Sequence, residues 1–377
     1  MSHRFRRVFA CVYSALLVLF TLYAALDIFV IPHRITAVAH EETSVAQADA
    51  SGPENTGTAE NDSALPSGPR IVKTAHGQTL SGDAAELSPE EDTTAQAEAN
   101  PPEEDTTAQA EAYPPEQTAA NTAQGEPLAI DGTVIGTYED GQSRITVTLI
   151  RAYDTDIYIA DILLSSHDAL QTAFASDTYG RNVKDETSAI ADAHGAVLAV
   201  NGDFYGSRTE GYVIRNGTLY RDTAGKNREG LAILEDGSFL FYEEPDVSAQ
   251  TLLSQGAVQA FSFGPVLLRD GEITVSETEE VGKAMASNPR TAIGMVDDLH
   301  YAFVVSDGRT NASEGLSLYE LAQVMREAGV REAYNLDGGG SSTMVFQGSV
   351  INNPTTSGKN TREREVSDII YIGGESK

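Results

Sequence analysis

The sequence predicts an α+β fold with mixed, largely antiparallel sheets and a few helices, preceded by one transmembrane helix and a disordered stalk. From about residue 126 onward, short apolar stretches recur between Gly, Asn and Asp residues, which is typical of strands and turns. Helical periodicity is rare and does not alternate regularly with the strands, which argues against a doubly wound parallel sheet. A long N-terminal apolar run, followed by a segment poor in large apolar residues, predicts the membrane helix and the stalk.

The N-terminus has the pattern of a signal anchor. Residues 1–7 include three arginines, and residues 8–31 are almost wholly apolar. At about 1.5 Å of rise per residue, this run is long enough to cross a bilayer. Because basic residues precede the span, we expect a cytoplasmic tail at residues 1–7 and an extracytoplasmic location for the rest of the chain. A signal peptide cleaved after Ala39 is the alternative, and we favour the anchor because the apolar run exceeds a usual signal core.

Residues 32–125 are predicted to form a disordered acidic linker rich in Ala, Glu, Thr, Gln and Pro. The sequence of Pro89–Ala99 returns unchanged at Pro102–Ala112, a 13-residue repeat that matches no solenoid period and offers almost nothing to bury. Its like charges repel one another and extend the chain. We therefore expect a tether without chemistry of its own.

The charge and cysteine content exclude several kinds of protein. A formal net charge of -31 argues against nucleic acid or an anionic surface as a partner. The single cysteine, Cys11, lies in the predicted span, so no disulfide framework supports the domain. A domain outside the cytoplasm then depends on its hydrophobic core for stability. The sequence leaves the oligomeric state open.

Residues 126–377 are predicted to form the globular domain. Its expected strands and strand pairs are Arg144–Ile150, Ile157–Leu164, Ala196–Val200, Tyr212–Tyr220, Leu231–Tyr242, Val258–Leu268, Thr291–Val296, Tyr301–Val305 and Ile369–Ile372. The first two alternate as paired strands. Tyr212–Tyr220 and Leu231–Tyr242 each contain an Asn-Gly or Asp-Gly dipeptide, which indicates a tight hairpin.

Three helices are expected among these strands, at Ala169–Ala175, Thr187–Ala193 and Leu316–Ala328. The last is the clearest, because its apolar residues recur on one face and Gly329 follows as a stop signal. So few helices among so many strands, in no regular alternation, are the reason for predicting an α+β domain.

The most informative stretch begins at Asp337, which stands at the end of an apolar run. The residues that follow it are Gly338, Gly339, Gly340, Ser341 and Ser342. Consecutive glycines let the backbone adopt φ > 0 and approach a ligand closely, and their N–H groups can converge on an anion. The Asp337 carboxylate can act as acid, base, nucleophile or metal ligand. A glycine-rich hairpin is the alternative, although three glycines exceed what a hairpin needs; a phosphate loop of the nucleotide-binding kind is excluded because no Gly-Lys-Ser/Thr follows.

Further polar residues follow or precede predicted strands at four places. They are Asn201 with Asp203, Arg290 after Pro289, Asp307 with Arg309, and Arg364 before the last strand. If these strand ends converge on one edge, carboxylates and guanidinium groups meet there in an otherwise acidic protein. Arginine at such a place suits a phosphate, which it binds with two parallel hydrogen bonds.

Other kinds of site are less well supported. His167, His194 and His300 lack metal-ligand spacing, so we interpret them as structural or exposed. There is no Gly-x-Ser-x-Gly motif and no Cys–His pair, which argues against acyl transfer. We expect no cofactor. A bound cation such as calcium, held by Asp203, Asp307 or Asp337, is left open because no ligand spacing demonstrates it.

In this order, the motifs resemble those of the phosphodiester glycosidase family. The matching residues are Val200–Gly202 with Phe204 and Tyr205, Asn288–Gly294, Asp307–Arg309, Gly315, Asn335–Ser342, and Arg364 with Val366–Asp368. They cover about Val197–Ile372. The resemblance implies an enzyme that removes a sugar from a sugar 1-phosphodiester and leaves a phosphomonoester. One position departs from the pattern, because the animal members have a second glycine where this chain has Asp203.

The residue chemistry agrees with that activity. Cleavage between C1 and oxygen builds positive charge on the sugar ring, which a carboxylate can stabilise or trap. We place Asp337 and Asp307 at the anomeric carbon, with Asp203 as a third candidate catalytic acid, and leave open which is nucleophile and which is acid or base. The candidate substrate-binding residues are Asn201, Arg290, Arg309, Arg364, Gly338, Gly339, Gly340, Ser341 and Ser342.

Two other functions stay open. A non-catalytic module that binds wall polysaccharide needs an aromatic platform, for which Phe204, Tyr205 and Tyr212 are the obvious candidates in a chain without Trp. A phosphodiesterase that cuts the P–O bond usually needs two metals, and few histidines are placed to hold them. From the topology alone, the expected substrate is a glycosyl phosphate of the cell envelope, such as a teichoic acid or a phosphoglycan.

Overall fold

The computed structural model describes residues 13–14, 16–23, 33–34, 125–226, 228–278 and 287–373. The predicted stalk and most of the predicted anchor lie outside these residues. Residues 13–14 and 16–23 are helical and exposed, and no helix within the described ranges is both long and apolar enough to cross a bilayer. The account below concerns the unit made of Met1–Glu41 and Ala120–Lys377.

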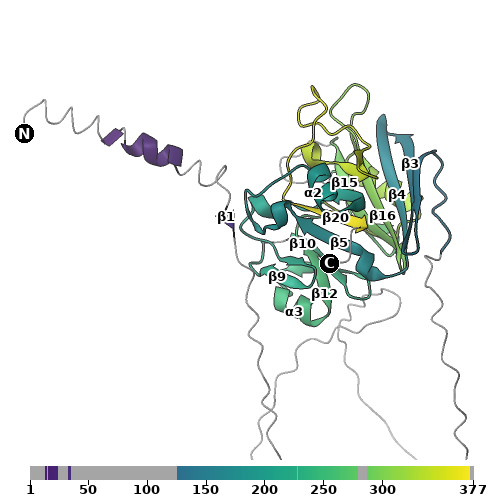
Figure 1. The fold of residues 1–377 in the computed structure, drawn as a ribbon, viewed down its shortest axis with the longest axis horizontal. Helices are drawn as coiled ribbons and strands as arrows, with labels where there is room; N and C mark the ends of the chain where they lie inside the picture. Colours follow the sequence, from purple (N-terminus) through teal and green to yellow (C-terminus); the bar gives the residue numbers. More distant parts are fainter. Residues whose placement is uncertain are drawn as a thin grey trace, which may run out of the picture. The chain divides into compact units, whose positions relative to one another are not determined.

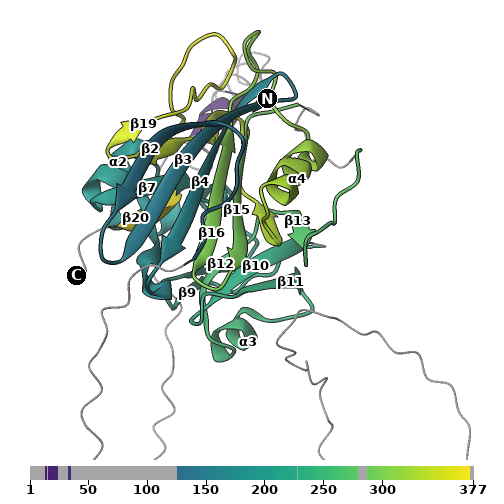
Figure 2. The same cartoon turned by 90° about the vertical axis from the view of Figure 1, so that its right-hand side faces the viewer.

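The largest sheet has eight strands, and its central strands lie side by side in Figure 2. Their spatial order is β14 (Glu272–Ile273), β13 (Val266–Arg269), β17 (Glu332–Asn335), β15 (Arg290–Asp297), β16 (His300–Ser306), β4 (Thr155–Leu164), β3 (Ser143–Ala152) and β2 (Thr133–Glu139). All neighbours are antiparallel. The predicted pairing of the two strands at residues 144–164 is confirmed by β3 and β4.

A five-stranded antiparallel sheet carries the helix α2 (Thr187–Ala193) on one face. Its order is β19 (Ser349–Val350), β18 (Met344–Phe346), β7 (Ala196–Asn201), β20 (Asp368–Gly373) and β5 (Leu170–Phe174). The helix predicted at Ala169–Ala175 is wrong, because β5 is a strand that pairs with β20. Leu170 and Ala173 contribute to different apolar clusters, so burial on both faces and pairing with β20 override the helical preference of this Ala-rich stretch.

The second five-stranded sheet contains both predicted hairpins. Its order is β11 (Phe239–Glu244), β10 (Arg228–Leu234), β12 (Ala257–Phe261), β8 (Val213–Arg215) and β9 (Thr218–Arg221), with α3 (Ala249–Ser254) against it. In both hairpins the predicted Gly of the turn has positive φ, 75° at Gly217 and 74° at Gly237. The remaining strand pair, β1 (His33–Arg34) with β6 (Gly180–Arg181), is antiparallel (Figure 1).

The single strand predicted at Val258–Leu268 is instead two strands in different sheets, β12 and β13. The chain leaves the sheet at Ser262 and Phe263, whose amides donate to side chains: to Asp203 Oδ2 at 3.0 Å and to the Tyr334 hydroxyl at 2.9 Å. Pro265 has no N–H to contribute to a ladder. This crossing links the two sheets beside Asp203.

The three large sheets pack around one apolar core. Leu198 of β7, Phe261 of β12 and Phe303 of β16 all belong to it and are fully buried. The opposite face of the eight-stranded sheet is covered by α4 (Leu318–Glu327). The predicted helix is confirmed there; it starts at a capping box of Ser317 and Glu320 and is followed by Gly329 at φ 97°. Mostly antiparallel sheets with few helices match the predicted class of the domain.

Candidate active site

Strand ends from distant parts of the chain meet around the side chain of Asn201, which is fully buried. Its Nδ2 donates to the backbone carbonyl of Asp337 at 2.6 Å. Its Oδ1 accepts hydrogen bonds from Thr291 Oγ1 at 2.9 Å and from the Thr343 amide at 3.3 Å. One side-chain amide therefore joins the ends of β7 and β17 to the starts of β15 and β18. The strand ends at Asn201 and Thr291 therefore converge with Asp337, as predicted, whereas Asp203 belongs to a separate cluster described below.

The glycine run lies between two sheets. It leads from β17 in the eight-stranded sheet to β18 in the five-stranded sheet, so the hairpin interpretation is wrong. The run turns through a short 3₁₀ helix at Gly339–Ser341, and Gly339 has φ 63°. A Cβ on Gly338 would lie 2.8 Å from the carbonyl oxygen of Pro289. The glycines are thus required by backbone conformation and by close backbone packing.

Three amides of this run already have acceptors in the protein. The amide of Gly339 donates to the Pro289 carbonyl at 2.8 Å, and those of Ser341 and Ser342 donate to the carbonyls of Gly338 and Gly339 at 3.3 Å. These three amides are therefore engaged within the protein rather than aimed at a common anion. Binding of substrate by the glycines stays a prediction.

The carboxylate of Asp337 is held on one side. Its Oδ2 accepts a hydrogen bond from Ser341 Oγ at 2.6 Å and one from Arg364 Nη2 at 2.8 Å. Ser341 Oγ in turn accepts from Arg364 Nε at 2.9 Å. The side chain of Asp337 is 13% exposed, and burial raises the pKa of its carboxyl group although Arg364 and Ser341 oppose the rise. Its Oδ1 has no hydrogen bond from the residues that the structure describes, so it is available to a ligand.

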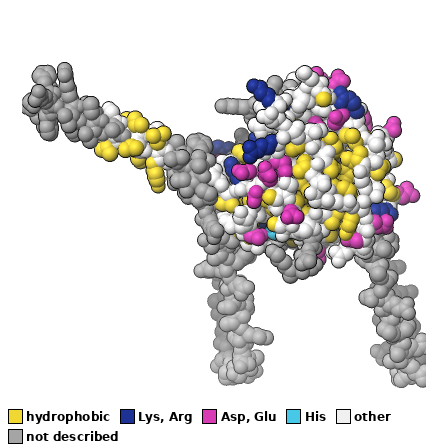
Figure 3. All heavy atoms as spheres, turned by 45° about the horizontal axis from the view of Figure 1, so that its top comes forward, with side chains coloured by type: hydrophobic (Ala, Val, Ile, Leu, Met, Phe, Trp, Pro, Cys, Tyr) yellow, Lys and Arg dark blue, Asp and Glu magenta, His cyan; other side chains and the backbone are white. Residues whose placement is uncertain are grey.

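Positive charge surrounds this carboxylate. Arg364 is 38% exposed and contacts it directly. Arg309 donates to Asn288 Oδ1 at 2.9 and 3.1 Å and to the Thr356 carbonyl at 2.6 Å; burial lowers the pKa of Arg309, as does Arg364, whereas Asp337 raises it. Arg208, which the sequence reasoning missed, also favours the charged form of Asp337. On the face shown in Figure 3, acidic side chains are spread widely and basic side chains lie in small groups.

Two of the other predicted residues are engaged with the framework. Arg290 is buried, its Nε donates to the carbonyl of Leu316 at 2.8 Å, and its amide donates to Ser306 Oγ at 3.0 Å. A Cβ on Gly338 would lie 3.9 Å from its Cδ, so Arg290 packs beneath the glycine run. Ser342 is fully buried, and its Oγ has no hydrogen-bond partner within the described ranges. Their roles toward a substrate stay predictions.

Asp307 is 4% exposed and is held by the loop that follows β19. Its Oδ1 accepts from the Asn353 amide at 2.7 Å, and its Oδ2 accepts from Asn353 Nδ2 at 2.8 Å. Asn352 links it to the glycine run, because its Nδ2 donates to Asp307 Oδ1 at 3.3 Å and to the Ser342 carbonyl at 3.0 Å. The structure thus brings Asp307 to the same region as Asp337 but ties up both of its oxygens; its place at the anomeric carbon stays a prediction.

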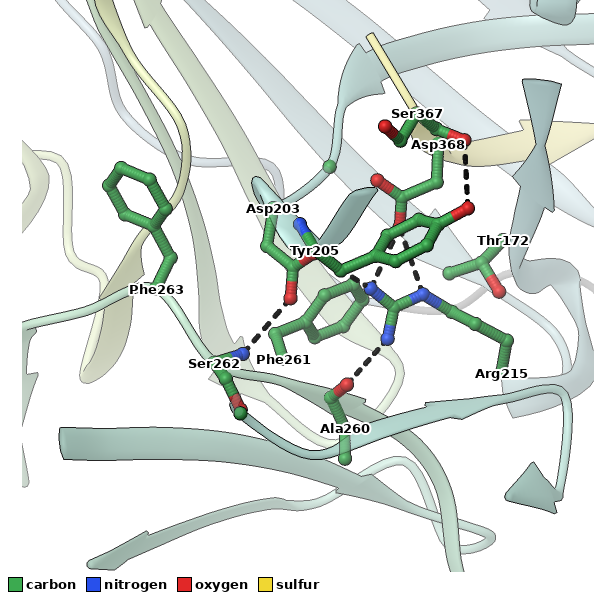
Figure 4. A network of polar contacts seen from close by, with 12 residues as sticks. Thr172, Asp203, Tyr205, Arg215, Ala260, Phe261, Ser262, Phe263, Ser367 and Asp368 are labelled. Carbon is green, nitrogen blue, oxygen red and sulfur yellow. Dashed lines mark hydrogen bonds and ion pairs between the residues drawn. The ribbon is translucent and has the colours of Figure 1, made fainter. Parts of the chain in front are cut away.

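Asp203 belongs to a second, buried cluster, in which it shares Arg215 with Asp368 (Figure 4). The side chains of all three are at most 2% exposed. Arg215 Nε and Nη2 donate to Asp368 Oδ2 at 2.9 and 2.7 Å, and Nη2 lies 3.2 Å from Asp203 Oδ1. Asp203 also accepts the amides of Tyr205 and Ser262 at 3.1 and 3.0 Å. The sequence analysis did not identify Arg215 as a candidate site residue, because its place within a predicted hairpin suggests only a structural role.

Two carboxylates facing one guanidinium leave an excess of negative charge. Burial raises the pKa of Asp368 to about 7. The attraction of Arg215 lowers this pKa, and the repulsion of Asp203 raises it further. Its Oδ1 has no hydrogen-bond partner among the described residues. Although burial alone lowers the pKa of Arg215, contact with Asp368 and Asp203 raises it overall. The cluster therefore keeps its cation, and Asp368 holds its proton to a higher pH than an ordinary aspartate does.

A cavity of about 960 Å³ lies beside Arg215 but includes none of Asp337, Arg309 and Arg364 in its lining. Its polar residues are largely bonded to one another: Thr172 Oγ1 lies 2.8 Å from Gln259 Oε1, and Gln259 Nε2 donates to Asn216 Oδ1 at 2.7 Å. Cavity size therefore does not identify the site here.

The histidines and aromatic residues have structural contacts. His300 Nε2 lies 2.6 Å from buried Asp161, and His194 Nε2 lies 3.2 Å from Asp177. No group of three or more His, Cys, Asp or Glu side chains within the described ranges has a geometry that could hold a metal. Of the three candidates for an aromatic platform, Tyr205 and Tyr212 are buried, and Phe204 is 37% exposed.

The fold and the site define a domain of antiparallel sheets with an acid and several arginines at converging strand ends. Residues 194–373 match the family model described as "Phosphodiester glycosidase". The chain is 31% identical over 183 residues to the "SPbeta prophage-derived uncharacterized protein YomE" of Bacillus subtilis (strain 168), covering 47% of this chain and 28% of that protein. It is 29% identical over 195 residues to "N-acetylglucosamine-1-phosphodiester alpha-N-acetylglucosaminidase" of Mus musculus, covering 47% of this chain and 38% of that protein.

A solved structure has a similar fold. It is the catalytic domain, auto-inhibited by a pro-peptide, of zebrafish N-acetylglucosamine-1-phosphodiester alpha-N-acetylglucosaminidase, with a TM-score of 0.50, 23% identity, and coverage of 62% of this chain and 83% of that one. Over residues 194–373, this chain is therefore similar to the phosphodiester glycosidase family. The chain spans 28% and 38% of the length of the bacterial and mouse relatives.

Proposed function

We propose that this domain hydrolyses the glycosidic bond of a sugar 1-phosphodiester and releases a sugar and a phosphomonoester. The observation that carries the proposal is the carboxylate of Asp337, with one oxygen held by Arg364 and Ser341 and the other without a hydrogen bond from the described residues. The substrate named for the mouse relative, an N-acetylglucosamine 1-phosphodiester, supports the same bond as the target.

The proposed reaction breaks the bond between C1 of the sugar and the phosphate oxygen, and the bonding electron pair leaves with the phosphate. Asp337 Oδ1 stabilises or traps the positive charge that develops at C1. The guanidinium groups around Asp337 stabilise the departing phosphate, which is a good leaving group once its charge is held. Water supplies the oxygen that C1 gains; one of its protons stays on that oxygen, and the other passes to the phosphate or to a carboxylate. The stereochemistry of the product distinguishes attack by Asp337 from attack by water.

We also propose that the domain acts outside the cytoplasm on a glycosyl phosphate of the cell envelope. This part rests on the basic residues before the apolar run at 8–31. Protease added to intact cells should release a folded domain by cutting between His40 and Gly125. Recovery of a soluble chain that begins at His40 would show cleavage of a signal peptide instead.

Hydrolysis of a panel of sugar 1-phosphodiesters by the full chain in ¹⁸O-labelled water tests the reaction. Label in the sugar supports cleavage between C1 and oxygen. Label in the phosphate shows that the enzyme is a phosphodiesterase. Tight binding of a wall polysaccharide without turnover of any substrate shows that the domain is a binding module.

A further inference from the structure

Arg208 differs from the other arginines near Asp337 in how its donors are used. Arg364 spends its Nε and Nη2 on Ser341 and Asp337, and Arg309 uses Nε and both Nη atoms on Asn288 and Thr356. The guanidinium group of Arg208 donates one hydrogen bond to a residue that the structure describes, from Nη1 to the Ser262 carbonyl at 2.8 Å. A guanidinium group has five N–H donors, so Arg208 has donors to offer a ligand.

The guanidinium group of Arg208 lies close to two aromatic rings. Its central carbon lies 4.8 Å from the ring centroid of Phe263 and 5.8 Å from that of Phe204. Cation–π contacts of this kind stabilise the charge and orient the guanidinium plane. Because its N–H bonds lie in that plane, an acceptor must approach the free edge rather than a face. A planar edge with parallel donors matches two oxygens of one phosphate group.

The charges around Arg208 also favour the binding of an anion. No carboxylate within the described ranges forms an ion pair with Arg208. Burial and the neighbouring Arg228 lower its pKa, whereas Asp203 and Asp337 raise it. Arg208 is therefore a half-buried cation whose charge favours the ionised form of Asp337, and it has no carboxylate as a direct partner within the described ranges. Such a group gains more from an anionic ligand than an arginine already paired with a carboxylate.

The placement of Phe204 fits this arrangement. It directly follows Asp203 and is one of few large apolar side chains of the described domain that are substantially exposed, at 37%. Its ring centroid lies 5.8 Å from the central carbon of the Arg208 guanidinium group, so the exposed ring is beside the arginine.

We propose that Arg208, which contacts the rings of Phe204 and Phe263, binds the phosphodiester group of the substrate and sets it beside Asp337. This inference rests on the proposed function, because it assigns a phosphate to the same site. Arg208 then determines specificity for glycosyl phosphates over glycosides with uncharged leaving groups. Arg364, by contrast, positions the Asp337 carboxylate.

The test uses the full chain and inorganic phosphate as the probe. Arg208→Lys keeps the charge but removes the two parallel donors, so we expect the inhibition constant of phosphate to rise about 10- to 100-fold. KM for a sugar 1-phosphodiester should rise similarly. Phe263→Leu keeps the arginine and should weaken phosphate binding about threefold, because one ring no longer orients the plane.

Arg269→Lys is the matched control, since the Arg269 guanidinium lies 5.0 Å from the ring centroid of Phe241 at an exposed position on β13. It should bind phosphate like the parent. Phosphate binding by Arg208→Lys equal to that of the parent, with a parent-like melting temperature, overturns the assignment of Arg208, as does a parent that does not bind phosphate. The proposed function fails separately if the parent binds phosphate through Arg208 but hydrolyses no sugar 1-phosphodiester.

Discussion

The domain contains two clusters of carboxylates and guanidinium groups with opposite charge balance. In the buried cluster, Asp203 and Asp368 share Arg215, and all three side chains are at most 2% exposed. In the cluster around Asp337, one carboxylate lies among Arg364, Arg309 and Arg208, and Arg364 is 38% exposed. The same chemical groups are thus arranged with excess negative charge inside the protein and excess positive charge where solvent reaches.

The difference separates a structural role from a ligand-binding role. Buried charges must be neutralised and hydrogen-bonded within the protein, and the buried cluster meets that need through Arg215 and through backbone amides. An exposed cluster does not need three cations for one acid, and their mutual repulsion is unfavourable without an anion. We infer that the positive charge of the cluster around Asp337 is neutralised only when a phosphate binds. Variants in each of the two clusters test this comparison.

The largest effect is expected on stability, from Arg215→Met. The substitution leaves Asp203 and Asp368 buried without their cation, which should lower the free energy of unfolding by about 3–5 kcal/mol. Urea unfolding measures it. Arg151→Met is the control, because Arg151 forms an exposed pair with Asp156 at 2.8 Å and is 53% exposed; its effect should stay below about 1 kcal/mol. Equal losses for the two variants would contradict the structural role of the buried cluster.

The next effect is on turnover, from Asp337→Asn. The amide cannot stabilise or trap charge at C1, so kcat should fall by at least about 100-fold on a sugar 1-phosphodiester. The side chain keeps its size, and Oδ1 accepts no hydrogen bond from the described residues. The free energy of unfolding should therefore change by about 1 kcal/mol or less. A lower melting temperature with turnover retained would assign Asp337 a structural role.

The buried cluster also predicts a dependence of stability on pH. Asp368 has a pKa of about 7 in the folded protein, against about 3.9 in an unfolded chain. Between these values the folded state binds more protons, so this group's contribution to stability falls as the pH rises from about 4 to about 7, by at most about 1.4 kcal/mol per pH unit. Asp368→Asn should flatten the slope measured by urea unfolding at pH 5, 6 and 7. An unchanged slope would show that Asp368 does not titrate in this range.

Sequence patterns predicted the exposed cluster better than the buried one. Asp337 and Arg364 were found because each stands at the boundary of an apolar strand, where polar side chains have a local reason to be noticed. Arg208 has no such signal, since the ring that lies 4.8 Å from it belongs to Phe263, in the crossing between β12 and β13. That crossing was itself predicted as one continuous strand. Contacts between segments that are far apart in the chain and share no repeating sequence pattern cannot be predicted from a single sequence.

The same limit explains the error at Ala169–Ala175. Its composition suits a helix, and the partner that makes it a strand, β20, lies at the far end of the chain. Local rules worked where the contacts are local, as in α4 with its capping box and in the two hairpins with glycine at positive φ. The fold class was therefore predictable, while the sheet to which each strand belongs was not.

The smallest effect is expected from Gly339→Ala, which asks how closely the exposed cluster depends on the glycine run. Gly339 has φ 63°, and a Cβ there would lie 2.8 Å from Arg309 Nη2. Gly348 has φ 76° with no atom within 4 Å of such a Cβ, so Gly348→Ala reproduces the backbone strain without the contact. Each variant should lose about 1 kcal/mol of unfolding free energy from the unfavourable φ.

Phosphate affinity distinguishes the two glycine variants. Gly339→Ala should weaken inhibition by phosphate about two- to fivefold, because the methyl group displaces Arg309 from its place near Asp337, whereas Gly348→Ala should leave it unchanged. The expected loss is small because the Gly339 amide already donates to Pro289, so no direct contact between that amide and phosphate is lost. A loss of 100-fold or more would show that the glycine amides rearrange to bind phosphate themselves. Equal phosphate affinity in both variants would show that Arg309 is not one of the cations that make this cluster an anion site.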